Sequence, residues 1–337
     1  MYHKKNIGKT IYFRVDGDHG KFAGLGHIFR SLKIYNYLKQ NLNQNYQFVF
    51  LSKYKKGKIL LNKYTKEKVL DYTNTIFNKL KVSKNDIFII DTLGAEKFLL
   101  KKLNQLKLKK ISFDEIRPNL FLKGIIINGI FFAKKKLKKS KNITIYQGPK
   151  YIILNKEYKV RKIIKKIDTN KLTALVCSGG ADAKNFLYKT SSLLKHSKLK
   201  KINVVIGQAV KKNNAIFKLK SNKVDKYLNL TSLKKLIDKS DIIICTGGTI
   251  MFEAIASGKK PFIFQNYLHQ KYAINYFDER RLIINCKNPT LKNIENLRNT
   301  LNSLLLNKQI NINTKQKRLV DGYGLDRCNK IIYDFVK

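Results

Sequence analysis

The sequence feature that most constrains the fold is an alternation between short apolar runs rich in β-branched residues and longer segments with apolar residues at helical spacing. Continuous apolar runs of this length are typical of strands that are buried on both faces of a parallel sheet. Strands that alternate with helices in this way indicate an α/β domain. In the first half of the chain, strands are predicted at 10–15, 47–51, 87–90, 110–113 and 125–127, with helices at 27–42 and 95–106.

The same alternation begins again near residue 172. The predicted strands are 172–177, 202–206, 224–228, 242–245 and 261–264, and the predicted helices are 183–194, 231–238 and 250–257. A single hydrophobic core stops growing near about 250–300 residues, and this chain has 337. We therefore predict two Rossmann-like, doubly wound parallel-sheet domains, one over residues 1–155 and one over 156–337. Open α/β sheets bind ligands beyond the carboxyl ends of their strands, so an inter-domain cleft is the expected site.

The charge balance is strongly basic, with 70 Lys+Arg against 22 Asp+Glu. Such a balance favours an anionic partner. Only nine of the basic residues are arginine, the residue that makes bidentate contacts to bases and phosphates, and the lysines are scattered along the chain. Drift in composition explains this pattern better than a nucleic-acid interface, so we expect no specific nucleic-acid partner. The basic surface is compatible with peripheral association with an anionic membrane.

The four cysteines are far apart and form no C-x-x-C pair, which excludes a zinc ribbon or a thioredoxin-like site and suits a reducing compartment. The first nine residues are polar and basic, without the apolar core of a signal peptide. The longest apolar stretches are about half of the roughly 20 residues that span a bilayer. We therefore expect a soluble, cytoplasmic and monomeric protein.

The first motif that can carry chemistry is GLGH at 24–27 with Arg30, between the first predicted strand and helix. Glycines let the backbone approach a ligand, and a helix N-terminus attracts an anion. His27 and Arg30 are three residues apart, so both lie on one side of the first helical turn. A helix N-terminus disfavours the imidazolium, which makes His27 a candidate general base. A structural, hydrogen-bonded histidine is the alternative, and His19 is the nearby competitor for the base role.

Two glycine-rich loops follow strands of the second half. The loop at 178–182 suits a phosphate or a sugar, but an ordinary turn in which Asp182 caps the next helix explains it equally well. In the loop at 245–253, backbone N–H groups with the hydroxyls of Thr246 and Thr249 suit a diphosphate. Glu253 lies one turn into the following helix and suits a ribose diol. Its alternative role is a favourable interaction with the helix dipole.

Together these motifs resemble one family. The chain looks like the UDP-sugar hydrolases of the pseudaminic acid pathway and the related spore-coat polysaccharide biosynthesis proteins, which have the two-domain glycosyltransferase-B fold. The resemblance covers nearly the whole chain. It rests on 13–16 with 24–27 and Arg30, on Asp91 and Asp114, on 148–151 with Leu154 and Tyr158, on 179–182, on 246–249 with Glu253 and Gln270, and on 321–324 with Arg327.

The resemblance implies a UDP-linked amino sugar as substrate, in surface-glycan biosynthesis of the nonulosonic acid type. His27 would be the general base that activates water against the anomeric carbon and releases UDP. No cofactor and no metal are implied. The implied substrate-binding residues are Arg14, Asp16, Gly26, Arg30, Asp91, Gly180 and Asp182, and the implied nucleotide-binding residues are Gly247, Gly248, Thr249, Glu253 and Gln270.

The chain departs from the family pattern at Thr92, Glu115 and Ala183. These positions lie on the sugar side of the expected site, so the fold is better determined than the substrate. The alternative enzyme is a glycosyltransferase that uses the same UDP-sugar with a sugar or lipid acceptor. A basic nucleic-acid-binding protein is the alternative of a different class, and it predicts binding that weakens steeply with salt.

Overall fold

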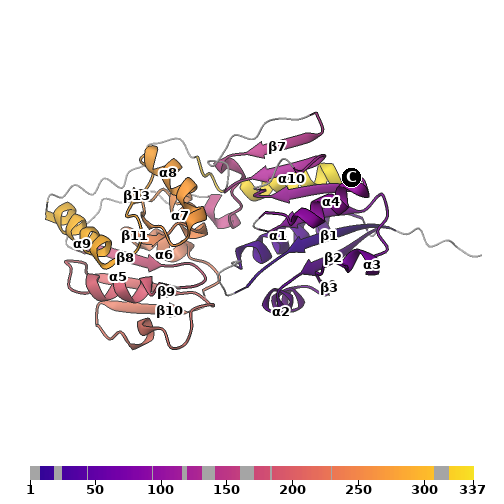
Figure 1. Ribbon diagram of the computed structural model, residues 1–337. Coiled ribbons are helices and arrows are strands. Elements are labelled where there is room, and N and C mark those ends of the chain that lie inside the picture. Colours follow the sequence, from indigo (N-terminus) through magenta and orange to yellow (C-terminus); the bar gives the residue numbers. More distant parts are fainter. Residues whose placement is uncertain are drawn as a thin grey trace, which may run out of the picture. The chain divides into compact units, whose positions relative to one another are not determined.

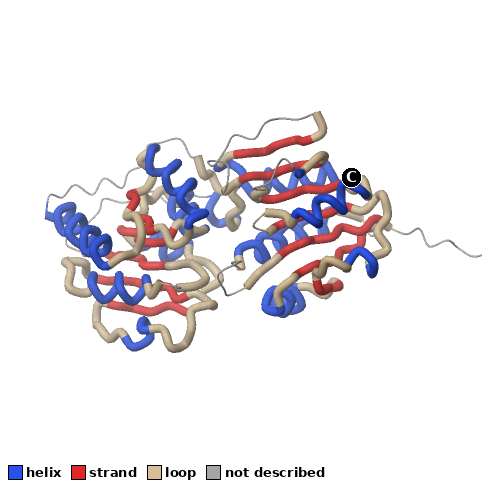
Figure 2. The backbone as a smooth tube through the Cα atoms, viewed as in Figure 1, coloured by secondary structure: helices blue, strands red, loops and turns tan. Residues whose placement is uncertain are grey.

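The computed structural model describes residues 8–18, 25–43, 45–92, 94–115, 120–130, 141–159, 171–182, 184–228, 230–306 and 319–337. The chain divides into two units, one formed by Met1–Ile153 with Gly324–Lys337 and the other by Leu154–Tyr323. Each unit contains one sheet with helices packed against it (Figures 1 and 2).

The described part of the first unit contains a seven-stranded, all-parallel sheet with the order β3-β2-β1-β4-β5-β6-β7. The strands are β1 (Lys9–Val15), β2 (Tyr46–Ser52), β3 (Lys68–Asp71), β4 (Ile87–Asp91), β5 (Lys109–Phe113), β6 (Gly124–Asn128) and β7 (Ile143–Gln147). The helices are α1 (Gly26–Asn41), α2 (Lys55–Tyr64), α3 (Ile76–Lys79), α4 (Lys97–Gln105), the 3-10 helix η3 (Pro149–Tyr151) and α10 (Gly324–Val336). The winding direction changes between β1 and β4, which is where ligands of open α/β sheets bind.

Both faces of this sheet are buried. In β1, Ile11, Phe13 and Val15 join an apolar cluster with α1 and α10, whereas Tyr12 joins the cluster on the opposite face with α4. Successive side chains of a strand point to opposite faces, so a strand covered on both sides must be apolar at consecutive positions. This requirement explains the continuous apolar runs in the sequence.

The C-terminal helix α10 packs on the first unit, although we expected residues 156–337 to form the second domain. Cys328, Ile332 and Val336 of α10 lie in the same apolar cluster as α1. Arg327 Nη1 donates to the backbone oxygen of Lys150 at 2.9 Å. A Cβ on Gly324 would lie 2.0 Å from the backbone oxygen of Ile152, so this close approach requires glycine.

The described part of the second unit contains a six-stranded, all-parallel sheet with the order β10-β9-β8-β11-β12-β13. The strands are β8 (Thr173–Cys177), β9 (Lys201–Ile206), β10 (Val224–Leu228), β11 (Ile242–Thr246), β12 (Phe262–Phe264) and β13 (Ile284–Asn285). The helices are η4 (Lys156–Lys159), α5 (Phe186–Leu194), η5 (Ala215–Lys218), α6 (Lys234–Lys239), α7 (Thr249–Ala256), η6 (Leu268–Gln270), α8 (Lys271–Glu279) and α9 (Leu291–Leu306).

The prediction of two doubly wound α/β units with parallel sheets is confirmed. Every predicted strand is present, with its ends within one residue of the predicted ends. The helix predicted at 183–194 begins later, at Phe186, because Asp182 accepts the Phe186 N–H at 2.7 Å and Asn185 has a left-handed backbone. Ala183 lies outside the described residues, as do Gly24, His19 and most of the basic stretch at 156–170.

Candidate active site

The carboxyl ends of β1, β4 and β5 bring a set of charged side chains together in the first unit. Asp91 is the last residue of β4, and Asp114 directly follows β5. Helix α1 begins at Gly26 and presents His27 and Arg30 in its first turns. Parallel strands end at the same edge of their sheet, so residues more than 60 positions apart in sequence meet here.

His27 and Arg30 both contact Asp91. Nδ1 of His27 lies 2.7 Å from Oδ1 of Asp91, and Nε and Nη2 of Arg30 donate to the two oxygens of the same carboxylate at 2.8 and 2.5 Å. The Ser31 hydroxyl donates to Oδ2 at 3.2 Å. The Asp91 side chain is only 1% exposed. The described side-chain donors that contact its two oxygens all come from α1. Asp91, for which the resemblance implies a substrate contact, is hydrogen-bonded to His27 and Arg30 in the structure.

The electrostatics of this group define the tautomer of His27. Burial alone would raise the pKa of Asp91, but the Arg30 guanidinium and then the His27 ring outweigh burial and hold that pKa well below its usual range. Two groups approach Nδ1 of His27: the Asp91 carboxylate at 2.7 Å, which only accepts, and the donor Nη2 of Arg30 at 3.3 Å. The shorter contact favours a proton on Nδ1 that is donated to Asp91. Nε2 of the neutral ring is then the nitrogen with a free lone pair, which is the arrangement that a general base requires.

The Arg30 guanidinium bridges two carboxylates. Its Nη1 donates to Oδ2 of Asp114 at 2.6 Å, and its Cζ lies 4.9 Å from the centre of the Phe113 ring. Burial lowers the pKa of Arg30, but Asp91 and Asp114 reverse this effect and raise it above its usual range. The resemblance implies a substrate contact for Arg30, and in the structure its guanidinium is hydrogen-bonded to both of these carboxylates.

Gly26 lies beside His27 in the first turn of α1. Among the described residues, no atom lies within 4 Å of a Cβ added to Gly26, and the His27 side chain is 17% exposed. The described part of the chain therefore leaves the neighbourhood of Gly26 unfilled.

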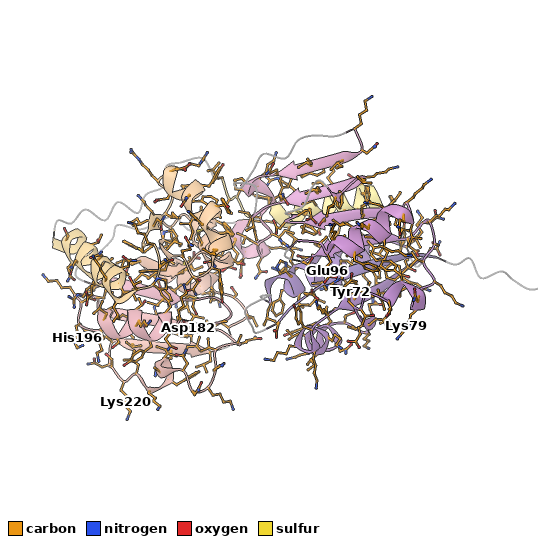
Figure 3. The ribbon with its side chains drawn as sticks, in the orientation of Figure 1. Tyr72, Lys79, Glu96, Asp182, His196 and Lys220 are labelled. Atoms are coloured by element: carbon orange, nitrogen blue, oxygen red, sulfur yellow. The ribbon has the colours of Figure 1, made fainter. Side chains whose placement is uncertain are left out.

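Arg14 and Asp16 pair with each other below the surface. Nη1 and Nη2 of Arg14 donate to the two oxygens of Asp16 at 2.5 and 2.8 Å, and Nη2 lies 3.3 Å from Oε1 of Glu96. The Arg14 guanidinium stacks on the Tyr72 ring, and Figure 3 labels Tyr72 and Glu96 in this unit. Asp16 also accepts the backbone N–H of Lys53 at 2.9 Å. These contacts hold the chain after β1 in place.

In the second unit, the loops after β8 and β11 meet at the carboxyl edge of the sheet. The Thr246 hydroxyl donates to the backbone oxygen of Ser178 at 3.0 Å. A Cβ on Gly180 or on Gly248 would meet no atom of the described residues within 4 Å, so these residues leave space beside both glycines. Gly247 is instead packed against Ile274, where a Cβ would lie 2.7 Å from a side-chain carbon.

Helix α7 begins at Thr249, which is exposed, and Gly248 is its N-cap without a side-chain cap. The first N–H groups of a helix have no partner within the helix and attract anions. Glu253 lies one turn further along α7 and is half-buried. Burial raises the pKa of Tyr158, and the Glu253 carboxylate raises it further, so the two side chains are neighbours.

Two residues for which the resemblance implies a ligand contact also hold these loops. The Asp182 carboxylate accepts the N–H groups of Phe186 and Leu187 at 2.7 and 3.2 Å and so caps α5, as the alternative interpretation proposed. Oε1 of Gln270 accepts the N–H groups of Asn266 and Tyr267 at 2.8 and 3.2 Å.

Sequence reasoning missed one side chain at these edges, Ser31. It follows Arg30 directly, but nothing in the sequence indicates that its hydroxyl turns to Asp91. Ser178, the first residue of the predicted loop at 178–182, is 6% exposed, and its hydroxyl has no hydrogen-bond partner among the described residues.

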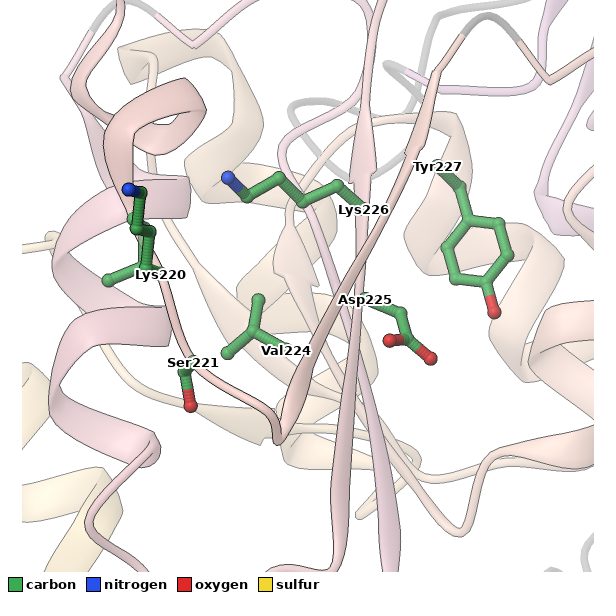
Figure 4. A pocket seen from close by; sticks show the side chains of 7 residues that line it. Lys220, Ser221, Val224, Asp225, Lys226 and Tyr227 are labelled. Atoms are coloured by element: carbon green, nitrogen blue, oxygen red, sulfur yellow. The ribbon is translucent and has the colours of Figure 1, made fainter.

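A hollow of about 610 Å³ lies apart from these residues, beside β10 (Figure 4). It is lined by Leu219, Lys220, Ser221, Val224, Asp225, Lys226 and Tyr227. Within the described ranges, no three His, Cys, Asp or Glu side chains are placed to hold a metal ion. The helices of those ranges are all too short or too polar to cross a membrane.

No protein-family model matches this chain. Its sequence is similar to those of two curated proteins. The chain is 33% identical over 273 residues to the uncharacterized protein MJ1062 of Methanocaldococcus jannaschii, which covers 75% of this chain and 55% of that protein. The chain thus spans about half the length of this relative. It is 24% identical over 337 residues to the spore coat polysaccharide biosynthesis protein SpsG of Bacillus subtilis, covering 96% of this chain and 98% of that protein.

Solved structures resemble the chain over nearly its whole length. MurG of Acinetobacter baumannii superposes with a TM-score of 0.62 at 14% identity and covers 97% of this chain and 99% of that one. The co-structure of S. aureus MnaA with UDP has a TM-score of 0.60 at 11% identity, with 97% and 96% covered. The calicheamicin glycosyltransferase CalG4 has a TM-score of 0.58 at 9% identity, with 97% and 98% covered. The two parallel-sheet α/β units of this chain therefore have the glycosyltransferase-B fold.

Proposed function

We propose that this protein is an enzyme of polysaccharide biosynthesis that hydrolyses a UDP-sugar by attack of water at the anomeric carbon. The observation that carries the proposal is the His27 ring held by Asp91 with Nε2 as its basic nitrogen. The similarity to SpsG supports a role in polysaccharide biosynthesis. The same fold in MnaA with UDP supports a UDP-containing substrate.

In this mechanism, Nε2 of His27 takes a proton from water as the water oxygen forms a bond to the anomeric carbon. The bond between that carbon and the UDP oxygen breaks, and its electron pair leaves with UDP. The imidazolium that forms is stabilised by the Asp91 carboxylate, which already accepts its Nδ1–H. A positioned base of this kind contributes roughly 10²–10⁴-fold to a rate.

The second unit would bind the UDP part. The described residues leave space beside Gly248 at the start of α7, so phosphate oxygens can approach the N–H groups of Thr249 and the next residue. The positive end of the helix dipole stabilises the charge that develops on the departing phosphate. Glu253 would accept hydrogen bonds from the ribose hydroxyls.

A glycosyltransferase that uses the same UDP-sugar is the second candidate, because MurG and CalG4 share the fold. The chemistry differs only in the nucleophile: His27 would deprotonate an acceptor hydroxyl in place of water. The two reactions differ in whether UDP release requires an acceptor.

The experiment is a screen of UDP-sugars for UDP release without acceptor, in water enriched in ¹⁸O, with His27→Gln as the matched inactive variant. We expect acceptor-independent release of UDP that carries no ¹⁸O, because water attacks carbon rather than phosphorus. Release that occurs only after an acceptor is added would replace the hydrolase by the transferase. Label in the UDP would contradict attack at carbon, and no release from any UDP-sugar would contradict both candidates.

A further inference from the structure

The Arg30 guanidinium is shared between two buried carboxylates that come from different strands. Nε and Nη2 hold Asp91 after β4, and Nη1 holds Asp114 after β5 at 2.6 Å. The Asp91 and Asp114 side chains are each 1% exposed. The Arg30 guanidinium thus links Asp114 to the Asp91 carboxylate that contacts His27.

The backbone of Asp114 has a left-handed conformation. Its φ is +48°, a region that aspartate and asparagine adopt more readily than other residues with a Cβ atom. Oδ1 accepts the backbone N–H of Ile130 at 3.0 Å, and the Asp114 N–H donates to the backbone oxygen of Ile127 at 3.0 Å. Both carboxylate oxygens of this buried aspartate are hydrogen-bonded, so its side chain is fixed at the edge of the candidate active site.

The charges of the described side chains that are linked to His27 do not cancel. Asp91 of β4 and Asp114 of β5 bring two negative charges, and Arg30 of α1 brings one positive charge. Cys328 of α10 also faces Arg30 and Asp114, but burial raises the pKa of its thiol to about 12, so it is neutral at lower pH. The network therefore has a net negative charge beside the imidazole, and Asp114 supplies that excess.

We propose that Asp114 is a positioning residue for the catalytic base: through Arg30 it holds Asp91 against His27, and its charge favours the protonated imidazole. This inference rests on the proposed function, because it gives His27 the role of base. Without Asp114, Arg30 would neutralise Asp91 alone, and the charge that stabilises the imidazolium would be lost. His27 would then become a weaker base.

Asp114→Asn tests the charge with little change in shape. Asparagine tolerates the left-handed region, and its amide oxygen can still accept the Ile130 N–H. Its NH2 group then faces Nη1 of Arg30, which is also a donor, so the variant removes the bridge together with the charge. Asp114→Gly is a second variant, since glycine adopts this backbone without strain. Glu115→Gln is the matched control: the neighbouring carboxylate is also buried, but it accepts from the Ala95 N–H and the Ser112 hydroxyl.

The experiment follows the ring protons of His27 by NMR as pH is varied in the full-length protein, with His27→Gln used to assign the signal. We expect the titration midpoint of His27 to fall by about 0.5–1 pH unit in both Asp114 variants and to stay in place in Glu115→Gln. An unchanged midpoint in a folded Asp114→Asn protein would overturn the proposal. An equal fall in Glu115→Gln would also overturn it, since the effect would then be a general field and not the Arg30 bridge.

The kinetic readout separates this proposal from the proposed function. The base must be neutral, so kcat/KM falls as pH drops through the His27 midpoint, and Asp114→Asn should move this acid limb to lower pH by the same amount. A purely structural role would lower kcat without moving the limb, which would contradict the proposal. If the wild-type protein releases no UDP, the proposed function fails, and the NMR titration still decides the role of Asp114.

Discussion

Nδ1 of His27 lies 2.7 Å from Oδ1 of Asp91, although 64 residues separate them in sequence. The contact joins the first turn of α1 to the end of β4. Arg30 holds the same carboxylate through two nitrogens, so Asp91 stays ionised and fixed in direction. The candidate base is therefore oriented by the fold before any substrate binds.

Replacing His27 by alanine should slow UDP release by about 10²–10⁴-fold while the fold and UDP binding are retained, because only the proton acceptor is lost. Steady-state kinetics with calorimetry of UDP binding measure both effects. His196→Ala is the matched control, since His196 is an exposed residue of the second unit. Near-normal turnover in His27→Ala would transfer the base role to another residue, with His19 tested next.

Asp91→Asn should slow the reaction by roughly 10²-fold or more, because the amide no longer selects the Nδ1–H tautomer.

Asp91→Asn should also lower the free energy of unfolding in a pH-dependent way. The pKa of Asp91 is depressed in the folded state, so its contribution is present above the unfolded pKa of about 3.9 and is lost as pH falls further. Urea unfolding at pH 7 and near pH 3 measures this difference, and a difference that grows in acid would contradict the assignment.

Glu253→Ala should weaken UDP binding by roughly 1–3 kcal/mol, the usual effect of removing a charged hydrogen-bond partner. Asp182→Ala is the paired variant, and it should leave UDP affinity unchanged while lowering stability by about 1–2 kcal/mol, since Asp182 caps α5. Calorimetry and thermal unfolding of both proteins distinguish the roles. If Asp182→Ala weakened UDP binding and Glu253→Ala lowered only stability, the ligand-binding role would belong to Asp182 and the structural role to Glu253.

Lys110→Met should stabilise the protein at pH 7 by about 1–2 kcal/mol. This value is smaller than the full pKa shift of Lys110 would give, because its ammonium group is partly solvated. Lys110 of β5 is only 1% exposed. Burial, with a smaller contribution from Lys123, lowers its pKa to about 8. The unfolded chain then binds more protons between pH 8 and about 10.4, so wild-type stability rises with pH there.

The gain from Lys110→Met should accordingly shrink as pH rises through that window. Urea unfolding at pH 7 and pH 10 measures it, with Lys101→Met on the exposed side of α4 as the control. A gain that is independent of pH would show that packing, and not the buried charge, limits stability at this position.

The sequence by itself determined the central strands of both sheets. Each of these strands must be apolar at consecutive positions because helices cover both faces, and that pattern is visible without any tertiary contact. β3, β7 and β13, which were not predicted, are edge strands with partly exposed side chains. The GLGH motif also identified the start of α1 and the candidate base.

Only the tertiary structure decided which partners the charged residues have. The sequence marks Asp91, Asp114 and Arg30 but does not show that one guanidinium bridges both carboxylates, because that contact depends on the parallel order of β1, β4 and β5. It likewise does not show that α10 returns to pack beside α1 in the first unit. Local patterns report what each segment buries, whereas the direction and register of segments distant in sequence determine which side chains meet.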